Sequence, residues 1–140
     1  MDFVDANVWL YALIRRQDAV KRRKAVALVS GTTRVVSTQV VNEVCVNLIR
    51  KAGFDDARIE RLVRSFYRRC VVTTVEQATL IEACRLRSRY SLSYWDSVIV
   101  ASARAAGCAT LYSEDMCDGQ VIDGAMTIVN PFREMQDASA

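Results

Sequence analysis

The sequence predicts an α/β fold with a mainly parallel sheet. Short runs rich in β-branched and aromatic residues alternate with longer stretches in which apolar residues recur every three or four positions. Strands separated by helical crossovers are typical of parallel sheets. With 140 residues, 51% of them hydrophobic, the chain is long enough to build one conventional core. We therefore expect residues 1–140 to form a single domain, with a frayed tail at residues 135–140.

Five short segments have the composition of strands and are bounded by turn or helix signals. They are Asp2–Asp5, Arg34–Ser37, Cys70–Thr73, Ala109–Ser113 and Thr127–Val129.

Capping residues mark the ends of two of the intervening helices. Asp18 is expected to cap a helix that runs to Ser30, with Gly31 ending it. The segment Ser93-Tyr94-Trp95-Asp96 has the pattern of a capping box, and Gly107 closes that helix.

Two helical patterns follow each other without a strand between them. Thr38 is expected to cap a helix running to Lys51, with Gly53 just beyond, and a second apolar stripe continues to Phe66. This order predicts a helical hairpin inserted into the alternating arrangement.

The composition excludes several kinds of site and compartment. The chain contains no histidine, so Ser-His-Asp triads, Cys-His pairs and histidine-ligated zinc sites are ruled out. Its five cysteines are odd in number and include no C-x-x-C pair, which is typical of reduced thiols in the cytoplasm. The longest apolar run, Val8 to Ile14, is too short to cross a membrane, and its flanking charges have the wrong polarity for a secretory signal. We expect a cytoplasmic protein with no membrane partner.

Positive charge is concentrated in the first half of the chain. Residues 1–69 carry a net charge of +7 and residues 70–140 of −4, within a total of +3. Arg58, Arg61, Arg64 and Arg68 have helical spacing and share one helix face. A solvated face explains any single cluster, but several in one half favour a polyanionic partner.

Acidic residues recur where the carboxyl ends of the predicted strands should meet. In open parallel sheets, ligands bind beyond these ends. Asp5 closes the first strand, Glu43 lies in the second turn of a helix that follows a strand, Asp96 lies in the first turn of a later helix, and Asp115 follows the fourth strand. Two like charges about 4 Å apart repel by roughly 4 kcal/mol at an effective dielectric of 20. Such a cluster therefore needs protons or a divalent cation, and carboxylate oxygens suit Mg²⁺ or Mn²⁺.

Each acid also has a local structural explanation, and these alternatives stay open at this point. Asp5 or Asn7 could cap the first helix, and Asp96 could complete the capping box. Glu43 could be an ordinary exposed glutamate, and Asp115 lies in a turn-like acidic stretch.

The order and spacing of several segments resemble the PIN-domain nucleases, in particular the VapC-like toxins of bacterial toxin–antitoxin pairs. The matching segments are Phe3-Val4-Asp5-Ala6-Asn7, residues 37–43 (Ser-Thr-Gln-Val-Val-Asn-Glu), residues 91–99 (Ser-Leu-Ser-Tyr-Trp-Asp-Ser-Val-Ile), Leu111-Tyr112-Ser113-Glu114-Asp115-Met116, Asp118-Gly119-Gln120 and Asn130-Pro131-Phe132.

The resemblance implies a three-layer α/β/α fold with a five-stranded sheet of order 3-2-1-4-5, and Mg²⁺- or Mn²⁺-dependent endoribonuclease activity. It implies that Asp5, Glu43, Asp96 and Asp115 are the catalytic acids, with Asp5, Asp96 and Asp115 as the principal metal ligands. Asn7, Ser113 and Asp118 would be supporting residues. The implied partners are an RNA substrate, a cognate antitoxin protein and a second copy of the chain.

Two other functions are compatible with an aspartate at the end of the first strand or with the fold alone. Aspartyl-phosphate enzymes and receiver domains also place an aspartate after the first strand, but they require a lysine near a late strand, and no lysine follows Lys51. A non-catalytic PIN-like module for RNA binding or assembly remains the main alternative. Trp9, Tyr11 and Tyr94 could stack on bases, although apolar helix positions are more often core.

Overall fold

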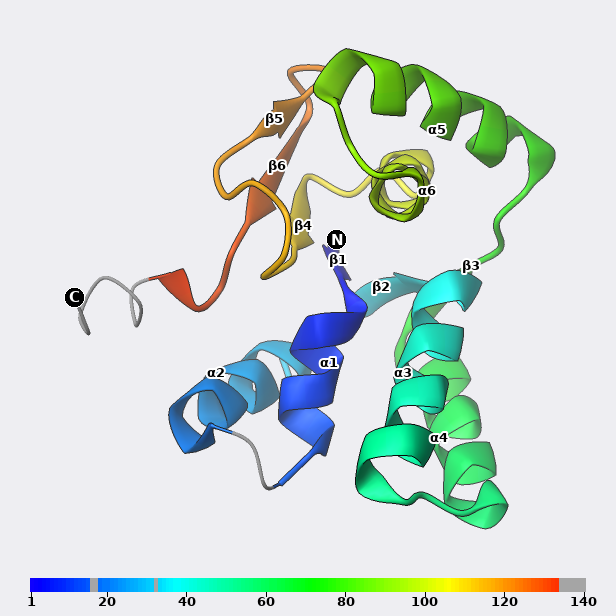
Figure 1. Ribbon diagram of the computed structural model, residues 1–140, viewed down its shortest axis with the longest axis vertical. Coiled ribbons are helices and arrows are strands. Elements are labelled where there is room, and N and C mark those ends of the chain that lie inside the picture. Colours follow the sequence, from blue (N-terminus) through cyan, green and yellow to red (C-terminus); the bar gives the residue numbers. More distant parts are fainter. Residues whose placement is uncertain (16–17, 32, 134–140) are drawn as a thin grey trace.

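The computed structural model, which describes residues 1–15, 18–31 and 33–133, places a six-stranded sheet between two layers of helices (Figure 1). The strands are β1 (Asp2–Val4), β2 (Arg34–Ser37), β3 (Val71–Thr73), β4 (Thr110–Tyr112), β5 (Val121–Ile122) and β6 (Met126–Val129). The helices are α1 (Ala6–Leu13), α2 (Ala19–Val29), α3 (Thr38–Ala52), α4 (Asp56–Arg69), α5 (Gln77–Tyr90) and α6 (Tyr94–Ala105).

The strand order is β3-β2-β1-β4-β6-β5. All five predicted strands are present and parallel, and they follow the expected order, with β6 in the fifth place. The expected count of five was wrong by one, because β5 pairs antiparallel with β6 at the edge of the sheet. With two residues, β5 is too short to produce a readable alternation of apolar and polar positions.

The helices lie in pairs around this sheet. Helices α5 and α6 lie together on one side, and the pairs α1/α2 and α3/α4 lie on the other (Figure 1). The predicted helical hairpin is confirmed, since α4 follows α3 with no strand between them. The last turn of α3 is followed by Gly53, whose positive φ of 65° allows the chain to reverse into α4.

The caps agree with the sequence at two of the three predicted positions. The Asp18 carboxylate accepts from the amides of Val20 and Lys21, and the Ser93 hydroxyl accepts from the Asp96 amide. Thr38 was the wrong cap for α3. The Ser37 hydroxyl accepts from the Val40 amide, so the cap lies one residue earlier, at the end of β2.

Apolar side chains of the central strands fill the core on both faces of the sheet. Phe3 and Leu111 are fully buried on neighbouring strands, and each contributes about 2 kcal/mol through removal of its apolar surface from water. Trp9 is also buried: its ring meets Phe66 edge-on at 4.9 Å, and its indole N–H donates to the Val4 carbonyl. Trp9 is therefore a core residue and not an exposed stacking surface.

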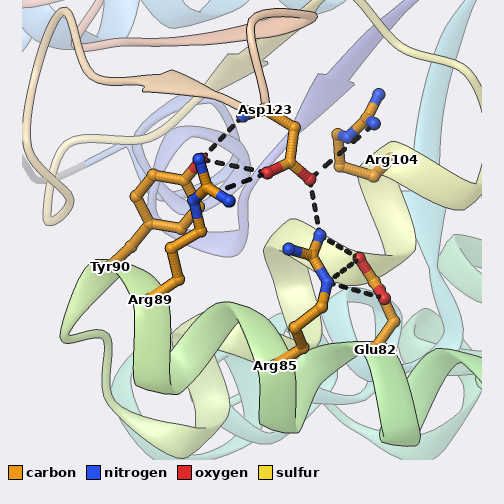
Figure 2. Close-up of polar contacts among 6 residues, drawn as sticks. All are labelled: Glu82, Arg85, Arg89, Tyr90, Arg104 and Asp123. Carbon is orange, nitrogen blue, oxygen red and sulfur yellow. Dashed lines mark hydrogen bonds and ion pairs between the residues drawn. The ribbon is translucent and has the colours of Figure 1, made fainter.

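A polar cluster connects the turn between β5 and β6 to the second half of α5 (Figure 2). Asp123 accepts from Arg85 at 2.6 Å and from the Tyr90 hydroxyl at 3.0 Å, while its own amide donates to that hydroxyl at 2.8 Å. Arg89 and Arg104 approach the same carboxylate at 4.0 and 3.9 Å. These contacts hold the antiparallel edge of the sheet against the helices.

The cysteines are all free thiols, as expected. No helix in the described part of the chain is long and apolar enough to span a membrane. The tail at residues 135–140, expected to fray, lies outside the described residues.

Candidate active site

The predicted acids lie on elements that meet at the carboxyl edge of the sheet. Because β1, β2 and β4 are parallel, α1 begins at the same edge as α3, and the segment after β4 leaves from it. The start of α6 reaches this edge as well, since the Gln39 side-chain amide donates to the Trp95 carbonyl at 3.5 Å. The topology therefore gathers residues that are far apart in the sequence.

Asp5 is the most enclosed of the four acids, with 7% of its surface exposed. One carboxylate oxygen accepts from the Ala6 amide at 2.7 Å, so Asp5 caps α1, and the other accepts from the Ser113 hydroxyl at 2.8 Å. Burial raises the pKa of Asp5 to about 6; these two hydrogen bonds oppose the rise, and the charges of Glu43 and Asp96 add to it. The capping and site interpretations of Asp5 are thus compatible.

Asn7 connects α1 to the segment after β4. Its amide nitrogen donates to Asp115 Oδ2 at 3.0 Å, and its amide oxygen accepts from the Glu114 backbone at 3.3 Å. Asp115 itself is exposed. Asn7 thus lies beside Asp115, and Ser113 lies beside Asp5.

Glu43 and Asp96 complete the acidic edge from the side of α3 and α6. Both are half-buried, and the Gln39 side chain donates to Glu43 Oε1 at 3.2 Å. Burial raises the pKa of Asp96, and the negative charge of Asp115 raises it further, against the hydrogen bond with Ser93. Asp96 is thus close enough to Asp5 to raise the pKa of Asp5, and close enough to Asp115 for Asp115 to raise the pKa of Asp96.

The donor chemistry of this edge fits a hard divalent cation. The four acids offer carboxylate oxygens, and Asn7 and Ser113 beside them are neutral. Burial first, and neighbouring negative charges second, raise the pKa values of Asp5 and Asp96 and so disfavour their ionisation without a cation. Within the described residues, however, no three acidic or thiol side chains are already spaced to hold a metal ion. The side chains of the exposed and half-buried acids would have to turn toward Asp5 to coordinate one ion.

Asp118, predicted as a supporting residue, makes polar contacts with the segment after β6. Its carboxylate accepts from the Asn130 amide at 2.6 Å and pairs with Arg133 at 2.5 Å, and these contacts lower the pKa of Asp118. Asp118 therefore ties the segment after β4 to the segment after β6.

Three residues near the site were not predicted to make the contacts that the structure shows. Tyr11 and Lys21 bind the Glu114 side chain, which lies 103 and 93 residues away along the chain. Gln39 was also missed, although its position four residues before Glu43 on one helix face could have indicated it.

A cleft of about 620 Å³ opens beside Glu43, between α3, the start of α5 and the start of α6. Trp95 lines this cleft and is 66% exposed, and its ring meets the exposed Tyr94 ring edge-on at 5.7 Å. The lining residues are Thr38, Gln39, Asn42, Glu43, Val75, Leu80, Tyr94, Trp95 and Val98.

Several solved structures share this fold. The chain is similar to VapC20 of Mycobacterium tuberculosis, a toxin that cleaves the sarcin-ricin loop, with 21% identity, a TM-score of 0.66, and coverage of 79% of this chain and 87% of that one. A toxin–antitoxin complex from Klebsiella pneumoniae is similar at 20% identity and a TM-score of 0.69, covering 94% and 98%. DNA-bound VapBC from Salmonella typhimurium is similar at 14% identity and a TM-score of 0.62, covering 93% and 97%.

Sequence comparison gives the family directly. No significant match was found among curated protein sequences. The PIN-domain profile, in contrast, matches residues 3–116, which include all four predicted acids and well over half of the chain. The observed α/β/α architecture, with its parallel strands in the expected order, agrees with that match. The chain belongs to the PIN-domain family.

Proposed function

We propose that the chain is a metal-dependent endoribonuclease and the toxin of a toxin–antitoxin pair. The observation that carries this proposal is the convergence of Asp5, Glu43, Asp96 and Asp115 on one edge of the sheet, with Asp5 buried under the influence of two neighbouring negative charges. Without a cation, ionisation of these neighbouring carboxylates is unfavourable. A cation bound there would also stabilise negative charge on the phosphodiester of a substrate.

The residues of the site have distinct roles in this proposal. Asp5, Asp96 and Asp115 would hold Mg²⁺ or Mn²⁺, and Glu43 would bind it directly or through water. When bound, the ion would acidify a water molecule and offset charge on the phosphoryl oxygens. Ser113 and the Ala6 amide orient the Asp5 carboxylate. No histidine is required as a general acid or base.

The substrate proposed for this site is RNA. Exposed arginines on α4 and the basic residues of α2 belong to the half of the chain with a net charge of +7. They would bind backbone phosphates, which contributes affinity without sequence selectivity. VapC20, a neighbour in fold, cleaves the sarcin-ricin loop, which supports RNA as the class of substrate.

Two protein partners follow from the proposal. The structures from Klebsiella pneumoniae and Salmonella typhimurium contain toxin–antitoxin assemblies, which supports an antitoxin that would inhibit this chain in the cytoplasm. We also propose a homodimer. Exposed apolar side chains on α3, α5 and α6, three of which line the cleft beside Glu43, offer a surface for a second copy. They are Val46, Ile49, Leu80, Ile81, Tyr94 and Trp95.

The decisive experiment is cleavage of a total-RNA pool by purified protein, with and without Mg²⁺, followed by mapping of the fragment ends. Asp5→Asn and Asp96→Asn should each lower cleavage by about 10²-fold or more. Asp56→Asn makes the same chemical change at the exposed start of α4 and should cleave like the wild type. Wild-type cleavage by both site variants would exclude the acidic edge from the reaction.

The alternative, a non-catalytic module that binds RNA or assembles with a partner, makes a different prediction. It requires RNA binding in EDTA with no turnover when Mg²⁺ or Mn²⁺ is added. Because all four acids are present, we favour the enzyme.

A further inference from the structure

A half-buried polar cluster lies directly behind Asp115 and has no part in the proposed chemistry. Lys21 Nζ from α2 contacts Glu114 Oε2 at 2.7 Å, and the Tyr11 hydroxyl from α1 donates to Glu114 Oε1 at 2.9 Å. Lys21 also lies 3.4 Å from the Tyr11 hydroxyl. The Lys21 and Glu114 side chains are only 20% and 17% exposed, so this ion pair is shielded from water.

The cluster adds to the contacts that hold the segment after β4, whose first residue, Ser113, also donates its backbone N–H to the Val129 carbonyl of β6 at 3.0 Å. Residues 113–115 leave the end of β4, and each of them is tied to α1 or to the residue that precedes it. The Ser113 hydroxyl binds Asp5, the Glu114 amide binds Asn7, and Asp115 accepts from Asn7. The Glu114 side chain adds the contacts with Tyr11 and Lys21, so α1 holds the Glu114 backbone through Asn7, and α1 and α2 together hold its carboxylate.

Of the three residues, Asp115 depends most on these contacts for the position of its side chain. It is exposed, and its carboxylate has one contact in the described part of the structure, the amide of Asn7. The direction of its side chain therefore depends on where the Glu114 backbone is held. In metal sites, groups behind the ligands orient them, and losing such a group typically lowers metal affinity by about 10- to 100-fold.

We propose that Lys21 is a positioning residue that, through Glu114, holds Asp115 in place for the divalent cation. This inference rests on the proposed function, since it assigns Lys21 a role in metal binding. A purely structural role is the competing explanation: the ion pair would then stabilise the packing of α2 against α1 without affecting the metal.

The test measures Mn²⁺ affinity by isothermal titration calorimetry, beside melting temperature and RNA cleavage. Lys21→Met keeps the aliphatic stem but removes the charge, and it should weaken Mn²⁺ binding by about tenfold. Lys21→Arg should restore most of the affinity, because a guanidinium can still pair with Glu114. Arg23→Met removes the same charge from an exposed position of the same helix and should leave Mn²⁺ affinity unchanged.

A double-mutant cycle makes the test specific to the pair. Glu114→Gln should weaken Mn²⁺ binding like Lys21→Met, and the combined variant should lose little more than either one. If Lys21→Met does not fold, Glu114→Gln and Lys21→Arg still report on the pair.

Each outcome decides for or against the proposal. Mn²⁺ affinity within about twofold of the wild type in folded Lys21→Met or Glu114→Gln would overturn it. So would equal losses in Lys21→Met and Arg23→Met, which would indicate a general charge effect. Absence of Mn²⁺ binding and of metal-stimulated cleavage in the wild type would instead overturn the proposed function, and this inference with it.

Discussion

The Asn7 amide donates to the Asp115 carboxylate at 3.0 Å and joins residues 108 positions apart in the chain. The same side chain accepts from the Glu114 backbone, so one amide fixes both the last proposed acid and the residue before it. Asn7 lies in the first turn of α1, two residues after Asp5. The first and the last of the four acids are therefore both held by the first turn of α1.

Removing this link should impair catalysis more than folding. Asn7→Ala frees the Asp115 carboxylate, and we expect kcat/KM for RNA cleavage to fall by about 10- to 100-fold. Asn7→Asp should lower kcat/KM at least as much, because it replaces the amide donor beside Asp115 with a second carboxylate. Kinetics on a fluorogenic RNA with Mg²⁺ would measure both. Asn47→Ala, which removes only a contact to the Glu43 backbone carbonyl, is the matched control and should stay near wild type.

Asp5 should lower the stability of the metal-free protein at neutral pH. Its pKa rises from 3.8 to about 6 on folding, so between these values the folded chain keeps a proton that the unfolded chain has lost. The free energy of unfolding therefore falls as pH rises through this window, by about 3 kcal/mol in total, and the loss is nearly complete by about pH 7. Asparagine is an equally good helix cap, so Asp5→Asn should remove this penalty.

Urea unfolding in EDTA across pH 4 to 8 would measure the effect. The stability gain of Asp5→Asn over the wild type should be small at pH 4 and grow toward its full value by pH 7. Asp56→Asn should show no such growth. A gain of the same size at every pH would mean that ionisation of Asp5 is not its cause.

The strands around this site could be predicted from the sequence. Their parallel order is then enough to bring their carboxyl ends to one edge of the sheet. Asp5 and Asp115 could be assigned to one edge without knowing any contact, since both follow strands of the same sheet. Segments of three or four residues were found from their β-branched composition, whereas β5, with two residues, was not. The resemblance implies a supporting role for Asp118, and nothing in the sequence indicated that its carboxylate accepts from the Asn130 amide.

Contacts between distant side chains could not be predicted from this one sequence. Lys21 is one of four consecutive basic residues, and nothing in that run distinguishes the one that meets Glu114. The pairing depends on how α2 returns along α1, which is decided by packing. The same holds for Asp123, an ordinary turn residue whose carboxylate is approached by three arginines from α5 and α6.

The contact between Tyr90 and Asp123 should matter for stability alone (Figure 2). The Tyr90 hydroxyl donates to the Asp123 carboxylate and accepts from its amide. Tyr90→Phe leaves that amide without its acceptor, at a cost of about 1 to 2 kcal/mol. The melting temperature should therefore drop by about 3 to 6 °C.

Catalysis by Tyr90→Phe at 25 °C should match the wild type, because the turn before β6 lies at the amino edge of the sheet, opposite the acids. Differential scanning calorimetry and RNA cleavage on the same preparation would test both statements. Tyr67→Phe, at an exposed position of α4, is the control and should melt like the wild type. A large loss of cleavage in Tyr90→Phe would show that this turn is coupled to the acidic edge.

The proposed homodimer predicts that charge on the apolar surface beside the cleft will separate the subunits. Ile81 is 64% exposed on α5, so Ile81→Glu should leave the monomer's core intact while placing a charge in the contact. Size-exclusion chromatography with light scattering should change from a dimer to a monomer of 15.7 kDa. Val121→Glu adds the same charge on the exposed edge strand and should remain dimeric. A dimer unaffected by Ile81→Glu would place the contact on another face, and a monomeric wild type would exclude the homodimer.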